Sequence, residues 1–129
     1  MVVTMGLDMY FTIRKPDING DVLMCMNGGF PIGFQSEGKQ IGYIRKGYSI
    51  HDYLLDILNV CHEDINCVDL ELNEIHLKAI KEEIEFREDE NYYEDDWDEH
   101  HWKELKSIMN VVETLRKDPD VKFYYTAWY

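Results

Sequence analysis

The sequence is poor in several residue types, and each shortage excludes something. It has three prolines and three cysteines in 129 residues, and alanine occurs only at positions 79 and 127. Three cysteines cannot all pair within one chain, and no charged-then-apolar leader opens it, which indicates a reducing, cytoplasmic setting. No apolar run approaches the roughly 20 residues that a membrane-spanning helix needs, so we expect no membrane location. Met5 is a more typical start than Met1, so residues 1–4 are interpreted as an upstream start or a dispensable extension.

Basic residues are also scarce. The chain has 13 Lys and Arg against 26 Asp and Glu, which gives a formal net charge of −13. Residues 61–129 carry 20 acidic and 8 basic residues, whereas residues 1–60 carry 6 and 5. Such a field repels nucleic acid and attracts cations or basic protein surfaces. We therefore expect no direct nucleic-acid binding, and a partner that is either a protein with a basic surface or a small anionic ligand held at a local cluster of cations.

The apolar content predicts a folded protein. Hydrophobic residues make up 45% of the chain and aromatic residues 13%, too much for a disordered acidic tail. A length of 129 residues fits one domain with a core of its own, so residues 1–129 are expected to form a single domain.

Alternating apolar and polar residues over 7–13 are typical of a half-buried strand. Further strands are expected over residues 22–26, 40–45, 68–72 and 121–128, with a turn at 15–20 and a glycine-rich loop at 28–34. Apolar residues at helical spacing predict a helix capped by Ser49, a second capped by Asn73 that runs to about Arg87, and a third over 102–115. The stretch 88–98 is expected to be a packed loop. The pattern predicts an α+β fold: a mostly antiparallel sheet of four to five short strands packed by about three helices.

Two neighbouring cations stand where a strand leads into a helix. Arg45 and Lys46 precede the first predicted helix, and exposed N–H groups at a helix start attract anions. His51, in the first turn, could donate a hydrogen bond or transfer a proton near neutral pH. With Tyr48 and Ser49 these residues form a candidate anion-binding site; the alternative is a solvated Arg-Lys pair beside a surface histidine.

The acidic run in the second half is a candidate partner surface. Residues 82–99 hold eleven carboxylates and one arginine, and such a run could occupy a basic cleft or only keep the protein in solution. The candidate surface residues are Glu88, Asp89, Glu90, Glu94, Asp95, Asp96, Asp98 and Glu99.

The chain ends in an aromatic strand. Tyr124 and Trp128 share one face of residues 121–128, and if exposed they could stack on a nucleobase or a partner side chain. Packing within the sheet is the alternative.

No motif names a reaction. The spacing of Cys61 and Cys67 is not that of a zinc site, so no metal and no cofactor are expected. The chain has no nucleophile elbow, dinucleotide fingerprint or phosphate loop. Catalytic residues therefore cannot be assigned from a motif.

Three segments together resemble a family of small tailed-bacteriophage proteins. They are the opening Met-Gly-Leu-Asp-Met-Tyr at 5–10, the segment 41–46 leading to Ile50-His51, and the ending at 123–128. The chain departs from the family at Ile44, where the family usually has Trp, and at Gly47-Tyr48, where it has Ala-Asn. The resemblance implies a phage accessory protein that binds or disables host factors.

These observations predict a non-enzymatic protein that binds and modulates a host factor, such as a counter-defence protein, through its acidic surface. One alternative is a protein that sequesters a small anionic ligand or nucleotide signal at Arg45 and Lys46. A third is a small hydrolase-type enzyme that uses His51.

Overall fold

Strands and helices follow one another in the order expected of an α+β chain. The computed structural model describes residues 6–14 and 38–129. Within these ranges the elements are β1 (Asp8–Arg14), β2 (Gly38–Arg45), α2 (Tyr48–Leu58), the short 3-10 helix η3 (His62–Asp64), β3 (Asp69–Leu72), α3 (Glu74–Glu90), α4 (Asp96–Leu115) and β4 (Lys122–Trp128). The features expected at residues 1–4, 15–20, 22–26 and 28–34 lie outside the described residues.

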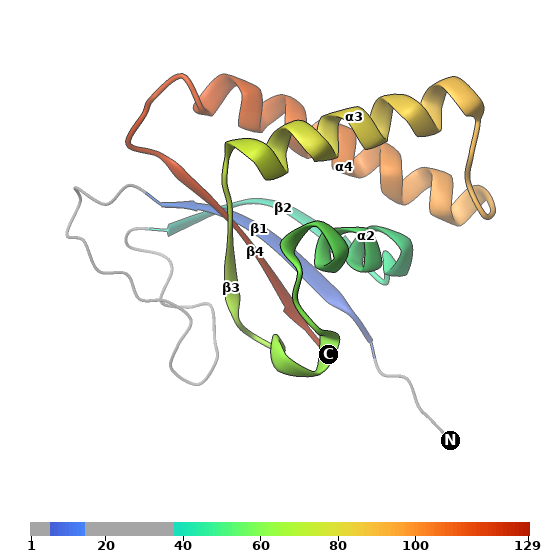
Figure 1. Ribbon diagram of the computed structural model, residues 1–129, viewed down its shortest axis with the longest axis horizontal. Coiled ribbons are helices and arrows are strands. Elements are labelled where there is room, and N and C mark those ends of the chain that lie inside the picture. The colour runs from blue at the N-terminus through green and yellow to red at the C-terminus, as the bar shows by residue number, and fades with distance from the viewer. Residues whose placement is uncertain (1–5, 15–37) are drawn as a thin grey trace.

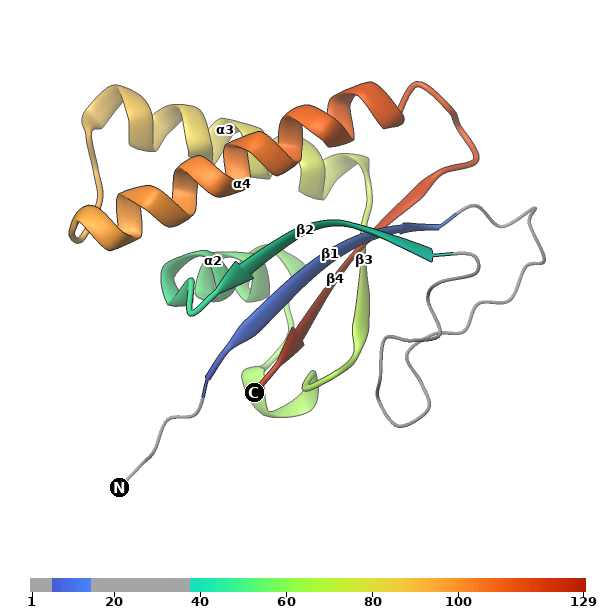
Figure 2. The same cartoon turned by 180° about the vertical axis from the view of Figure 1, so that it is seen from behind.

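The four described strands form one antiparallel sheet in the order β2-β1-β4-β3. All four lie where strands were expected from the sequence, to within two residues at each end. Helices α2, α3 and α4 pack together on one face of this sheet (Figures 1 and 2). The expected α+β class, with a mostly antiparallel sheet and three helices, is therefore confirmed, and the described residues form a single domain.

The core lies between the sheet and the helices. Met9 and Phe11 of β1 and Phe123 and Tyr125 of β4 are buried on the helix-covered face. Alternate residues point the other way because successive side chains of a strand leave opposite faces. Trp102 of α4, which is 1% exposed, is among the largest side chains in this core.

Two glycines allow the layers to approach closely. A Cβ atom at Gly42 of β2 would lie 2.4 Å from Cδ1 of Ile108 in α4. One at Gly47 would lie 2.9 Å from Cγ2 of Ile44. Both distances are shorter than a carbon–carbon contact permits, so the absence of a side chain lets α4 and the start of α2 sit directly on β2.

The helix ends differ in part from the sequence-based expectation. Asn73 caps α3 as predicted, with its side chain accepting bonds from the backbone of Ile75 and His76. Ser49, however, is not a cap: α2 begins at Tyr48, and Gly47 takes the cap position without a side-chain bond. The stretch 88–98 is not a loop, because α3 continues to Glu90 and α4 already begins at Asp96.

None of the helices in the described parts of the chain combines the length and apolarity that a membrane crossing requires.

Candidate functional site

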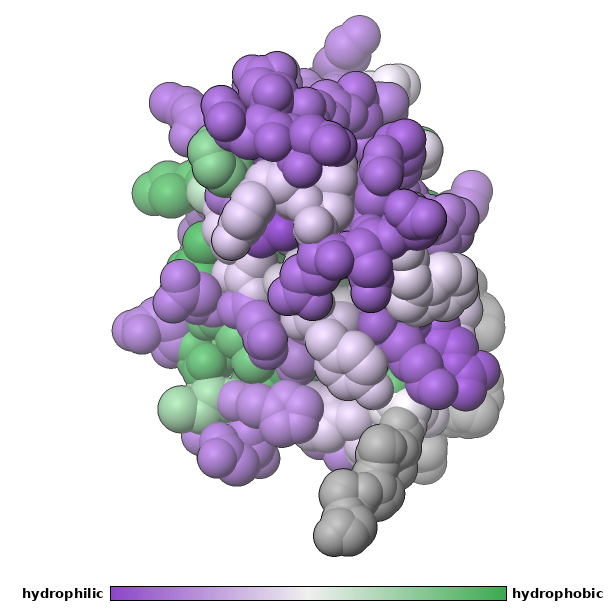
Figure 3. Space-filling model, turned by 90° about the vertical axis from the view of Figure 1, so that its right-hand side faces the viewer, coloured by the Kyte–Doolittle hydropathy of each residue, from purple (hydrophilic) through white to green (hydrophobic). Residues whose placement is uncertain are grey.

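The connection between α3 and α4 brings the candidate surface carboxylates together. We use the term acidic turn for residues 88–99, which comprise the last turn of α3, the connection 91–95 and the first turn of α4. It lies at one end of the helical layer, and hydrophilic side chains cover that part of the molecule (Figures 1 and 3). The eight carboxylates expected to form a partner surface all belong to this segment, but they have different surroundings.

Two of the eight hold the start of α4. Asp95 is the N-cap, and its Oδ1 accepts a bond from the backbone N–H of Asp98 at 2.8 Å. Asp98 is 7% exposed, and its Oδ2 accepts a bond from the backbone N–H of Glu94 at 2.9 Å. Asp98 therefore does not belong to the surface, since its carboxylate turns inward to satisfy the backbone of the connection.

Two more carboxylates are neutralised by lysines of α4. Glu88 is paired with Lys106 at 2.7 Å, and Glu99 with Lys103 at 3.0 Å. Such exposed pairs contribute little stability, but they reduce the charge available to a partner.

The remaining four carboxylates are available for binding. Asp89, Glu90, Glu94 and Asp96 are exposed, and none forms an ion pair with another described residue. Two large aromatic side chains emerge among them: Tyr92 is 58% exposed and Trp97 is 59% exposed. The acidic turn therefore presents free negative charge and exposed rings on the same surface, and both groups attract cations.

Asp89 and Glu90 occupy an unfavourable position for a carboxylate. Both lie in the last turn of α3, where the helix dipole carries partial negative charge. We predict that the double change Asp89→Asn/Glu90→Gln raises the free energy of unfolding by up to roughly 1 kcal/mol at low salt. Urea denaturation followed by circular dichroism measures this difference.

A matched control lies in the next helix. Asp96 is in the first turn of α4, where the dipole favours an acid, so Asp96→Asn should lower the free energy of unfolding instead. Changes of the same sign in both variants would contradict this account. Changes of opposite sign would show that Asp89 and Glu90 do not stabilise the helix that carries them, so stability does not explain their presence there.

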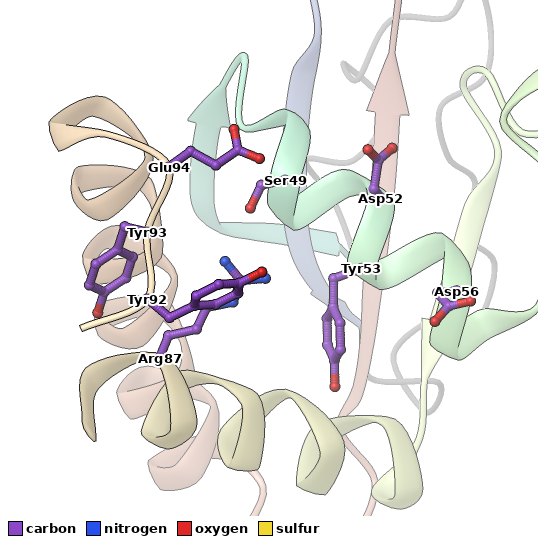
Figure 4. A pocket seen from close by; sticks show the side chains of 8 residues that line it. All are labelled: Ser49, Asp52, Tyr53, Asp56, Arg87, Tyr92, Tyr93 and Glu94. Atoms are coloured by element: carbon purple, nitrogen blue, oxygen red, sulfur yellow. The ribbon is translucent and has the colours of Figure 1, made fainter. Parts of the chain in front are cut away.

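A pocket of about 500 Å³ opens between α2 and the acidic turn (Figure 4). It is lined by three tyrosines, three carboxylates, a serine and an arginine: Tyr53, Tyr92, Tyr93, Asp52, Asp56, Glu94, Ser49 and Arg87. Figure 4 shows that the α2 residues form one wall, while Arg87 and the residues of the connection form the other. This volume is within the range of about 300–1,000 Å³ that is usual for ligand sites.

The inner wall of the pocket is built around Arg87. Its guanidinium carbon lies 4.2 Å from the ring centre of Trp102 and 5.1 Å from that of Tyr92. Its Nε donates a hydrogen bond to Glu83 at 2.8 Å, and Asp98 lies 3.9 Å from its Nη1. The charge of Arg87 is therefore already balanced by carboxylates behind the pocket.

Two tyrosines of the pocket have raised pKa values. Burial raises the pKa of Tyr53, and the nearby carboxylates of Glu83, Glu82 and Asp56 raise it further. Burial likewise raises the pKa of Tyr93, with added contributions from Glu88 and Glu99. Burial is the largest cause of both shifts, and the carboxylates add to it because they oppose formation of another negative charge nearby, whereas Arg87 lowers both pKa values.

The residues of the expected anion site are only partly brought together. Arg45, Lys46 and Tyr48 are exposed where β2 leads into α2. Ser49 turns toward α4, and its hydroxyl oxygen accepts a bond from Nε1 of Trp102 at 2.8 Å. His51 is 2% exposed and points into the core, so it is not placed beside Arg45 at the surface.

His51 belongs instead to a cluster that reaches from the core to the exposed residue His62. Its Nδ1 lies 2.6 Å from the hydroxyl of Tyr125, and its Nε2 lies 3.0 Å from Nδ1 of His62. Burial and then the neighbouring His62 lower its pKa to about 4. A histidine with this pKa stays neutral near pH 7, which does not suit the proton transfer expected of it.

The two expected stacking residues contact other parts of the sheet. Tyr124 is half-buried, and the guanidinium carbon of Arg14 lies 4.2 Å from its ring centre. Trp128 is half-buried, with its ring centre 5.9 Å from that of Tyr10. Both rings therefore pack with neighbouring strands.

Ser49 was expected in a ligand site, but the other α2 residues of the pocket were not predicted to belong to one. They are Asp52, Tyr53 and Asp56. Among residues 6–14 and 38–129, no group of three or more His, Cys, Asp or Glu is arranged to hold a metal ion.

Comparison of the chain with protein-family models, curated proteins and solved structures finds no match. The function is therefore inferred from the geometry and charge of the site.

Proposed function

We propose that the protein is a non-enzymatic binding protein whose acidic turn docks on a basic surface of a partner protein. The observation that carries the proposal is that free carboxylates and exposed aromatic rings share one surface, with Asp89, Glu90 and Asp96 beside Tyr92 and Trp97. By covering a basic surface the protein modulates its partner. The resemblance to phage accessory proteins supports a host factor, such as a defence enzyme, as that partner.

The two kinds of side chain have complementary roles in such a contact. Free carboxylates speed the encounter with a basic surface by electrostatic steering, and they disfavour acidic competitors. Tyr and Trp supply the large contact areas that carry most of the binding energy in protein interfaces. Lys and Arg side chains also bind favourably over aromatic faces.

A peptide probe tests the proposal. We expect a short fluorescent peptide rich in Lys and Arg to bind the protein at low salt, and its glutamine-substituted counterpart not to bind. The affinity should fall as salt is raised, since the screening length shrinks from about 10 Å at 0.1 M to about 3 Å at 1 M. Fluorescence anisotropy measures both effects.

A matched pair of variants separates the acidic turn from net charge. The triple change Asp89→Asn/Glu90→Gln/Asp96→Asn should weaken peptide binding about tenfold. The triple change Glu63→Gln/Asp64→Asn/Asp120→Asn neutralises three exposed carboxylates outside the acidic turn and should weaken it much less. Equal losses in the two variants, or no binding of the basic peptide to the unchanged protein, would overturn the proposal.

A further inference from the structure

The pocket beside the acidic turn has a composition that selects one kind of ligand. We propose that it binds a guanidinium group, supplied by an arginine side chain of the partner. This inference rests on the proposed function, because it names the partner group that the acidic turn brings to the pocket. Three features of the pocket support it: its charge, the spacing of its carboxylates and its aromatic walls.

The charge of the pocket requires a cation. Asp52, Asp56 and Glu94 lie at its exposed rim, and none of them is paired with a cation of a described residue. The one cation of the lining, Arg87, is already bonded to Glu83. A phosphate or carboxylate ligand would meet three uncompensated negative charges at the entrance, whereas a cation would neutralise them.

The spacing of the carboxylates on α2 suits a planar cation. Asp52 and Asp56 are four residues apart, so they stand just over one helical turn, about 6 Å along the axis, from each other on the same side of α2. A guanidinium has five N–H donors that point to different sides of one plane, which suits two carboxylates that point in different directions, as those of Asp52 and Asp56 do (Figure 4). An ammonium group is a compact point charge and cannot span the two in the same way.

The aromatic walls suit the faces of the same group. Tyr53 lies between the two aspartates in sequence, and Tyr92 lies on the opposite wall (Figure 4). The protein already holds one guanidinium by ring contacts here, since Arg87 packs against Trp102 and Tyr92. A second guanidinium over Tyr53 would have its face on a ring and its edges toward the rim carboxylates.

A neutral isostere provides the sharpest test. We would titrate the isotope-labelled protein with Nα-acetyl-arginine methylamide and follow backbone amide shifts by NMR. The same titration is repeated with the lysine analogue, which carries an ammonium group, and with the citrulline analogue, which is uncharged and has nearly the shape of arginine. We expect the arginine probe to shift the amides of Tyr53 and Tyr92 and to bind at least about tenfold more tightly than the citrulline probe. The lysine probe should bind several-fold more weakly than the arginine probe.

Variants assign the binding to the pocket. Asp52→Asn/Asp56→Asn should weaken the arginine probe at least about fivefold. Glu63→Gln/Asp64→Asn, which removes the same charge from η3, should change its affinity less than about twofold. Equal binding of arginine and citrulline, no effect of Asp52→Asn/Asp56→Asn, or shifts confined to the acidic turn would overturn the inference. The amide spectrum of each variant shows at the same time whether its fold is retained.

The two proposals fail separately. If the arginine probe does not use the pocket but the basic peptide still requires Asp89, Glu90 and Asp96, the guanidinium site is wrong and the proposed function stands. If the probe binds in the pocket but the peptide is indifferent to the acidic turn, the proposed function is wrong and the pocket remains a cation site.

Discussion

Replacing Trp102 by alanine should lower the free energy of unfolding by about 3–5 kcal/mol, the usual range for deleting a buried Trp or Phe side chain. Trp102 is 1% exposed, and its ring joins the three long helices. From α4 it donates a hydrogen bond to Ser49 of α2 and lies beneath the guanidinium of Arg87 from α3. Loss of the Trp102 ring would leave a cavity and would remove the hydrogen bond to the Ser49 hydroxyl. Arg87 would lose one of its two aromatic contacts. Urea denaturation followed by circular dichroism measures the effect.

The same helix contains a matched control. Trp97 is 59% exposed, so Trp97→Ala should change the free energy of unfolding by less than about 0.5 kcal/mol. Trp102→Phe should give an intermediate loss, because it keeps most of the buried ring but removes the Nε1 donor to Ser49. Similar losses for Trp97→Ala and Trp102→Ala would contradict the assignment of Trp102 as the link between the helices.

The strands were predictable from the sequence because the sheet has one buried face. Phe123, Tyr125 and Ala127 are buried along β4, Tyr124 and Trp128 are half-buried, and the period of two is visible in the sequence without coordinates. The start of α2 was not predictable, since Ser49 has the residue type of an N-cap. Its hydroxyl is engaged by Trp102, which lies far away in the sequence, so a tertiary contact overrides the local preference.

The start of α4 was hidden by the acidic run. Asp95 caps the helix by bonding the backbone of Asp98, but in a stretch with so many carboxylates one capping aspartate does not stand out.

The buried position of His51, by contrast, could have been predicted from the helical spacing of apolar residues. It lies three residues before Leu54 and four before Leu55 on the apolar face of α2, which predicts a buried position for it.

Only part of the candidate site could be predicted, again because tertiary packing is not visible in the sequence. The acidic turn is continuous in sequence, so composition alone identified its carboxylates. The pocket combines that turn with Asp52 and Tyr53 of α2, and no motif links segments so far apart along the chain. Only the packing of α2 against α3 and α4 brings the two groups together, and that packing depends on buried residues such as Trp102.

Replacing His51 by alanine should lower the free energy of unfolding at pH 7 by about 2–4 kcal/mol, through the lost packing and the loss of the partner of a buried hydroxyl. All contacts of the neutral ring are satisfied when the Tyr125 hydroxyl donates to Nδ1 and the Nε2–H donates to His62. The ring also lies 5.9 Å, centre to centre, from that of Tyr129. An alanine would leave the Tyr125 hydroxyl in the core without this partner, because it is 0% exposed.

The loss should depend on pH in a defined direction. Burial, followed by the neighbouring His62, lowers the pKa of His51 from 6.5 to about 4, and Asp52 opposes this shift. Between these two values the unfolded chain binds a proton at His51 that the folded protein does not bind, so this group destabilises the fold as pH falls from 6.5 toward 4.

The change His51→Ala abolishes this pH dependence of the free energy of unfolding. The stability difference between the unchanged protein and the variant should therefore shrink by up to about 3 kcal/mol over this window. The matched control is His100→Ala, whose side chain is 55% exposed and which should leave the stability at pH 7 almost unchanged. A difference between His51→Ala and the unchanged protein that stays constant from pH 7 to pH 4 would show that His51 titrates as a solvated histidine, and its placement in the core would then have to be revised.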